Sequence, residues 1–76
     1  MKQFIVVYEA FNGGMQFFGP FDSKESASQW MSDDFAKSVG KCEKELGYEP
    51  NWIHDIEVAT IEDYGEWHVA ELEEPK

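Results

Sequence analysis

The chain of 76 residues contains no arginine, a single cysteine and no long apolar run. Its six lysines stand against 16 carboxylates, so the formal net charge is −10. Binding to nucleic-acid phosphates needs a basic surface, and this composition therefore disfavours direct nucleic-acid binding. Cys42 has no second cysteine to pair with, which excludes an internal disulfide. Because we find neither a signal peptide nor a run of about 20 apolar residues, we expect a cytoplasmic protein that does not enter a membrane.

Motifs for metal binding and catalysis are also missing. Zinc sites usually contain a close ligand pair such as Cys-x-x-Cys, and neither His54 nor His68 has such a partner. Gly13-Gly14 lacks the lysine and the strand-to-helix context of a phosphate-binding loop. The periodicity around Cys42 turns its thiol inward, as for a packing residue rather than a nucleophile. We therefore expect no catalytic residue, no metal and no cofactor, and hence a protein that is not an enzyme.

A β-hairpin is predicted at the start of the chain. Residues 3–9 are rich in β-branched and aromatic side chains, and Asn12-Gly13 suits the positive φ angles of a two-residue hairpin turn. With that loop, Tyr8 would face Phe17 across the two strands. Gly19-Pro20 is expected to end the second strand, because proline cannot donate to a ladder. Both faces of this hairpin are apolar, so either both are covered or one is exposed to a partner.

The middle of the chain has the pattern of an amphipathic helix. Asp22 or Ser23 can accept hydrogen bonds from the first free backbone N–H groups. Over residues 23–39, apolar side chains recur at spacings of three and four and so share one face, which we expect in the core: Ala27, Trp30, Met31, Phe35 and Val39. The apolar stripe continues towards Gly47. A straight helix of that length would span about 36 Å, which is longer than such a small domain needs. We therefore expect a break near Gly40.

The last part of the chain predicts a second hairpin. Polar and apolar residues alternate over 52–62 and again over 67–72, and residues 63–65 fit a three-residue loop with glycine in the left-handed position. The expected order is ββαββ, an α+β fold with a single antiparallel sheet of about four strands and one main helix packed on one face. We expect residues 1–76 to form a single small acidic domain.

Negative charge is concentrated in the C-terminal part. Residues 1–44 carry six acids and five lysines, whereas residues 45–76 carry ten acids and one lysine. In the predicted register Glu57 faces Glu71 and Asp55 faces Glu73, with about 6.6 Å between neighbouring carboxylates along each strand. Such rows can imitate a phosphate backbone, and the alternative is a solvated surface that only aids solubility. The first candidate partner-binding site is this acidic face: Asp55, Glu57, Glu62, Asp63, Glu66, Glu71 and Glu73.

A second candidate site is the aromatic face of the first hairpin, with Tyr8, Phe17 and Phe18. Aromatic side chains are favoured at protein interfaces, and edge strands or apolar faces can pair with a second copy. This alternative describes a protein-interaction or homodimerisation module whose binding tolerates salt.

Residues 18–23, which open the helix, and residues 67–75, which close the chain, resemble small acidic proteins encoded by bacteriophages. Several proteins of that kind are anti-defence inhibitors, among them anti-CRISPR and DNA-mimic proteins, which bind a host nuclease complex without catalysis. The resemblance implies a non-enzymatic inhibitor in the host-cell cytoplasm that blocks the basic, nucleic-acid-binding surface of a host protein or nucleoprotein complex. It offers no common motif whose residues could be carried over one by one.

Overall fold

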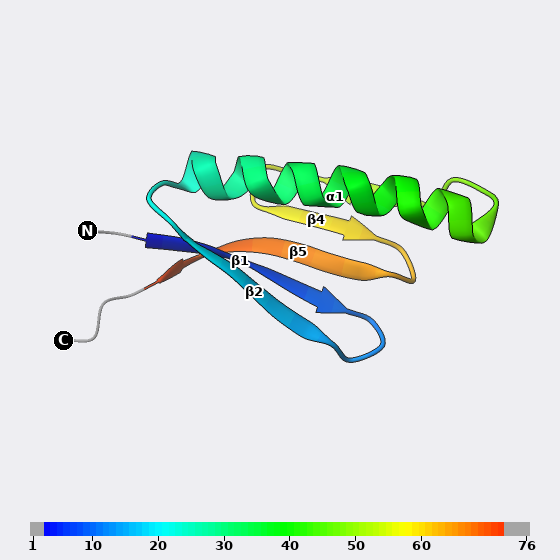
Figure 1. Cartoon of the computed structure of the whole chain (residues 1–76), viewed down its shortest axis with the longest axis horizontal. Helices are drawn as coiled ribbons and strands as arrows, with labels where there is room; N and C mark the ends of the chain where they lie inside the picture. The colour runs from blue at the N-terminus through cyan, green and yellow to red at the C-terminus, as the bar shows by residue number, and fades with distance from the viewer. Residues whose placement is uncertain (1–2, 73–76) are drawn as a thin grey trace.

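The computed structural model describes residues 3–72, which form one helix and five strands. Their order is β1 (Gln3–Ala10), β2 (Met15–Phe21), α1 (Lys24–Leu46), β3 (Trp52–His54), β4 (Val58–Ile61) and β5 (Gly65–Leu72). The strands make one antiparallel sheet in the order β2-β1-β5-β4-β3, and α1 runs along the molecule on one side of it (Figure 1). The α+β class with one helix and one antiparallel sheet is confirmed, but the sheet has five strands instead of four.

The first hairpin turns through three residues, so the predicted two-residue loop is wrong. Ala10 N donates to Gly14 O at 2.7 Å and Gly13 N donates to Ala10 O at 2.9 Å, with Gly13 at a φ of 103°. A left-handed glycine at the third position is the usual solution for a three-residue loop. The pairing therefore shifts by one residue, and Phe17 lies opposite Val7 instead of Tyr8. A shift of one residue places Tyr8 and Phe17 on opposite faces of the sheet.

Strand β2 continues through Pro20 to Phe21, where we expected it to end. β2 is an edge strand with no further strand beside it, so the missing backbone N–H of Pro20 breaks no hydrogen bond of the sheet on that side. The pairing with β1 changes by one residue between Val6 and Phe4, which is the mark of a bulge. The bulge returns Phe21 to the helix side, where its ring lies 6.1 Å from that of Trp30.

Helix α1 is continuous, and the break expected near Gly40 does not occur. Ser23 accepts from Ser26 N at 3.1 Å to begin the helix, and Gly47, at a φ of 77°, ends it by donating to Glu43 O at 2.9 Å. The molecule extends 48 Å along its longest axis and so accommodates a helix of about 35 Å. Gly40 costs only about 1 kcal/mol in propensity, which the burial of Cys42 two residues later offsets.

The predicted strand over 52–62 is split into β3 and β4, because the chain reverses direction over 55–57. Three contacts hold this turn against the first half of α1. Ser28 Oγ donates to Ile56 O at 2.7 Å, Ser32 Oγ lies 2.9 Å from His54 Nε2, and Lys24 forms an ion pair with Glu57. These long-range contacts leave no signal in local periodicity, which is why the alternation over 52–62 indicated one strand.

The loop between β4 and β5 comprises residues 62–64, one position earlier than predicted. Asp63 takes the left-handed position at a φ of 62°, and Tyr64 N donates to Ile61 O at 3.1 Å. The ladder then pairs Thr60 with Glu66 instead of His68, a shift of two residues that keeps each side chain on its predicted face. The pair expected between Glu57 and Glu71 does not form in this register, and Glu73, expected opposite Asp55, lies outside the described residues.

The core lies between α1 and the sheet. The sheet contributes Val6, Ala59, Ile61 and Trp67, and the helix contributes Ala27, Met31, Phe35 and Cys42, all buried. The predicted helical stripe is thus confirmed as a core face, with Trp30 and Val39 partly buried at its margins. Trp67 Nε1 donates to the Asp34 carboxylate at 3.0 Å, which satisfies the indole inside this core.

Candidate interaction surface on the open sheet face

The sheet has one covered face and one open face. Side chains alternate along a strand, and Val6 and Trp67 lie in the core under α1. Val7 and His68, which oppose each other across β1 and β5, therefore lie on the other face, together with Phe17 opposite Val7. α1 is the one helix among residues 3–72, and it packs only on the covered face (Figure 1). We call the other side the open face: Gln3, Ile5, Val7, Glu9, Met15, Phe17, Ile53, Val58, Thr60, Glu66, His68, Ala70 and Leu72.

Large apolar side chains are exposed on the open face. Phe17 is 64% exposed, Ile53 73% and Met15 52%. Val7 is only 6% exposed, although it lies outside the main core, because its cross-strand neighbours flank it. With about 3.3 Å per residue and about 4.8 Å between strands, the face has an area on the order of 500 Å². This area includes polar side chains such as Glu9 and Glu66, so the apolar part is smaller; contiguous exposed apolar side chains on a monomer often serve an interaction.

A shallow hollow of about 310 Å³ adjoins the open face, lined by Phe11, Asn51, Trp52, Ile53, Thr60 and Glu62. Phe11 reaches it because its backbone N–H donates to Tyr64 O at 3.1 Å, which holds the first hairpin loop beside the β4–β5 loop. Ile53 and Thr60 are paired neighbours of β3 and β4. The hollow is therefore a mostly apolar recess at the margin of an apolar sheet face.

Two carboxylates also lie on the open face. Glu9 of β1 and Glu66 of β5 are directly opposed, and neither carboxylate has a hydrogen bond or an ion pair with another residue of the described range. All lysines within residues 3–72 are on α1, on the far side of the sheet: Lys24, Lys37, Lys41 and Lys44. The open face is thus largely apolar, with His68 and a local pair of negative charges among its polar side chains.

The three aromatic residues of the second predicted site are divided between the two faces. The Tyr8 ring packs 4.6 Å from that of Trp67, and the Phe18 ring lies 4.4 Å from that of Trp30, both on the helix side. Phe17 alone of the three lies on the open face. Sequence reasoning missed the exposed Ile53 and Met15, because local patterns do not show which face of the sheet α1 covers.

The carboxylates of the first predicted site are spread over several parts of the molecule. Glu57 is paired with Lys24, and the Asp55 carboxylate accepts from Ile56 N at 2.7 Å inside the β3–β4 turn. Glu71 lies opposite Phe4 of β1, and Glu66 is on the open face. Glu73 lies outside the described residues. No continuous row of these acids forms along the described part of the sheet.

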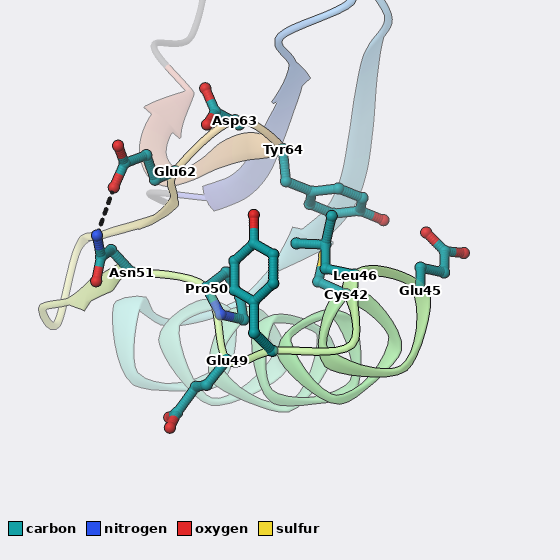
Figure 2. Close-up of a pocket in the computed structure, with 10 residues that line it drawn as sticks. Cys42, Glu45, Leu46, Glu49, Pro50, Asn51, Glu62, Asp63 and Tyr64 are labelled. Carbon is teal, nitrogen blue, oxygen red and sulfur yellow. Dashed lines mark hydrogen bonds between the residues drawn. The ribbon is translucent and has the colours of Figure 1, made fainter.

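Two of the predicted acids, Glu62 and Asp63, line a hollow at one end of the molecule together with two other acids. The end of α1, the following segment and the β4–β5 loop surround a hollow of about 580 Å³. We call this region the acidic end, after its carboxylates Glu45, Glu49, Glu62 and Asp63. Figure 2 shows that the carboxylates of Glu45, Glu49 and Asp63 lie on different sides of the hollow and point away from one another. Glu62 instead accepts from Asn51 Nδ2 at 2.9 Å.

The chemistry of the described residues gives little support to a reactive centre. Burial raises the pKa of the Cys42 thiol, and the nearby Glu45 raises it further, so the thiolate is disfavoured. Among residues 3–72, no three His, Cys, Asp or Glu side chains lie close enough together to hold a metal ion. No helix in this part of the chain is long and apolar enough to cross a membrane.

Tyr8 should make the free energy of unfolding decrease as the pH rises above 10. Burial, together with the charge and hydrogen bond of Tyr64, raises the pKa of Tyr8 from 10.0 to about 12. The unfolded chain then ionises first, so stability is complete below pH 10 and falls by up to about 2–3 kcal/mol as the pH approaches 12. Urea unfolding over this range should show the loss. Tyr8→Phe should show a weaker dependence, and an equally steep one would contradict this assignment.

Comparison of the chain with protein-family models, with curated proteins and with solved structures finds no match in any of the three. The functional argument therefore rests on the geometry and chemistry of the chain itself.

Proposed function

We propose that this protein is a non-catalytic interaction domain that binds a protein partner through the open face. The observation that carries the proposal is a sheet covered by a helix on one side, with Phe17 and Ile53 more than half exposed on the other. Burying a phenylalanine or isoleucine side chain is worth about 1.5–3 kcal/mol, so covering this face would contribute substantially to association. The protein-interaction module that the sequence suggested as an alternative becomes the leading function, with a different set of residues.

The test compares two exposed aromatic residues of equal accessibility. Phe17 and Tyr48 are both 64% exposed, but Tyr48 lies at the acidic end. Tagged wild-type protein, Phe17→Ser and Tyr48→Ser are used to capture partners from the lysate of the source cells, and the affinity for a captured protein is then measured with purified components. Phe17→Ser should weaken binding at least tenfold and Tyr48→Ser should have little effect. Equal binding by Phe17→Ser and the wild type would refute the proposal.

A second candidate is the phage-type inhibitor, with the acidic end as its binding surface. The observation that favours it is the gathering of Glu45, Glu49, Glu62 and Asp63 around one hollow. Such a surface would attract the basic groove of a host nucleic-acid-binding protein, and its binding would weaken with salt and be displaced by DNA or RNA. The same capture experiment, washed at low and high salt, separates the candidates, because binding through apolar contacts with the open face should survive high salt.

A further inference from the structure

We infer that the open face recognises a cationic amphipathic segment of a partner protein, with apolar side chains on the sheet and a lysine or arginine on the Glu9–Glu66 pair. This inference rests on the proposed function of the open face and adds the chemistry of the partner.

The first argument is the arrangement of Glu9 and Glu66. They form a directly opposed pair between β1 and β5, which places their Cβ atoms about 4.5–5.5 Å apart. Like charges in that position destabilise a sheet, and no lysine within residues 3–72 lies on this face. A guanidinium or ammonium group between the two carboxylates would remove the repulsion and form charge-assisted hydrogen bonds. The unbound protein therefore carries a site that is unfavourable until a cation arrives.

The second argument is that an apolar recess lies beside this pair. Glu66 opposes Thr60 across β5 and β4, and Thr60 lines the 310 Å³ hollow together with Phe11 and Ile53. An apolar side chain in the hollow and a cation on the carboxylates would thus be close neighbours. Lysine and arginine also have apolar stems, which suit a surface where charge and apolar groups alternate. This combination is typical of a basic amphipathic segment.

The third argument weighs against a second copy as the occupant. A two-fold dimer would bring the open face against itself, because such an interface uses the same patch on both subunits. It would assemble four carboxylates with no lysine from residues 3–72, since those lysines are on α1. His68 is the one basic side chain that the open face would supply. Two chains, each with a formal net charge of −10, would also repel each other.

The test uses two synthetic helical peptides of equal length, one of leucine and lysine and one of leucine and glutamate. Each is titrated into the isotope-labelled full chain, and the amide shifts locate the site while calorimetry measures the affinity. We expect the lysine peptide to bind with shifts along β1, β5 and β2. The glutamate peptide should bind at least tenfold more weakly.

Matched variants separate this site from general attraction to an acidic protein. Glu9→Gln with Glu66→Gln and Glu45→Gln with Glu49→Gln remove the same charge, but only the first pair lies on the open face. The first double variant should lose at least tenfold in affinity for the lysine peptide and should be at least as stable as the wild type, because a repulsion is removed. The second should lose less than threefold.

An equal loss in both double variants, or shifts confined to the acidic end, would overturn the inference. If sedimentation showed a dimer of the wild type and a monomer of Phe17→Ser, the occupant of the open face would be a second copy of the chain instead of a cationic segment. In either case the proposed function would stand if Phe17→Ser still abolished partner binding, so the two failures are distinguishable.

Discussion

Replacing Trp67 by alanine is expected to remove a large fraction of the protein's total stability. Trp67 is 1% exposed, and its ring lies 4.6 Å from Tyr8 and 5.5 Å from Phe35 between centroids. The substitution also leaves the Asp34 carboxylate without the indole donor. Loss of a buried tryptophan costs about 3–5 kcal/mol. A chain of this size has a total stability of roughly 4–11 kcal/mol at 0.05–0.15 kcal/mol per residue.

Far-UV circular dichroism in a urea series measures this loss. Trp52→Ala is the matched control, because Trp52 is 46% exposed and contacts the core at its edge, through Phe35. That variant should lose only about 1–2 kcal/mol. Similar unfolding midpoints for the two variants would contradict the placement of Trp67 at the centre of the core.

Gly65→Ala is expected to destabilise the fold by about 1–3 kcal/mol through overpacking. A Cβ atom at Gly65 would lie 2.5 Å from Tyr8 Cε1 and 2.7 Å from its hydroxyl oxygen. The Tyr8 ring has little room to move, since the rings of Trp67 and Tyr64 lie 4.6 and 6.2 Å from it. The strain should appear as a lower urea midpoint.

Gly40→Ala provides the opposite control. Apart from the adjacent residues and the backbone of α1 itself, no atom lies within 4 Å of a Cβ at Gly40, which sits inside α1. Alanine there should stabilise the protein by about 0.5–1 kcal/mol, because it restricts the unfolded chain and favours helix. If Gly65→Ala raised stability as Gly40→Ala should, the close approach of Gly65 to Tyr8 would be excluded.

The distribution of the acidic residues shows where local reasoning reaches its limit. The concentration of charge in residues 45–76 is visible in the sequence, but the position of each carboxylate depends on the reversal of the chain over 55–57. That reversal sends Glu57 to Lys24 and leaves Glu66 opposite Glu9, a residue 57 positions away along the chain. The pairing of β1 with β5 has no local signal, because it joins the two ends of the described chain.

The sequence by itself determined the helix and its buried face, a helix start at Asp22 or Ser23, the turns that follow β1 and β4, and the α+β class. The spacing of apolar residues, three and four in a helix or two in a strand, is a local property. It decides which side chains share a face, whatever the rest of the chain does. The tertiary structure alone decided that α1 runs through Gly40, that residues 52–62 form two strands, and that one sheet face is open. These features depend on contacts between distant segments, where small local preferences are outweighed by the burial of Trp67, Phe35 and their neighbours.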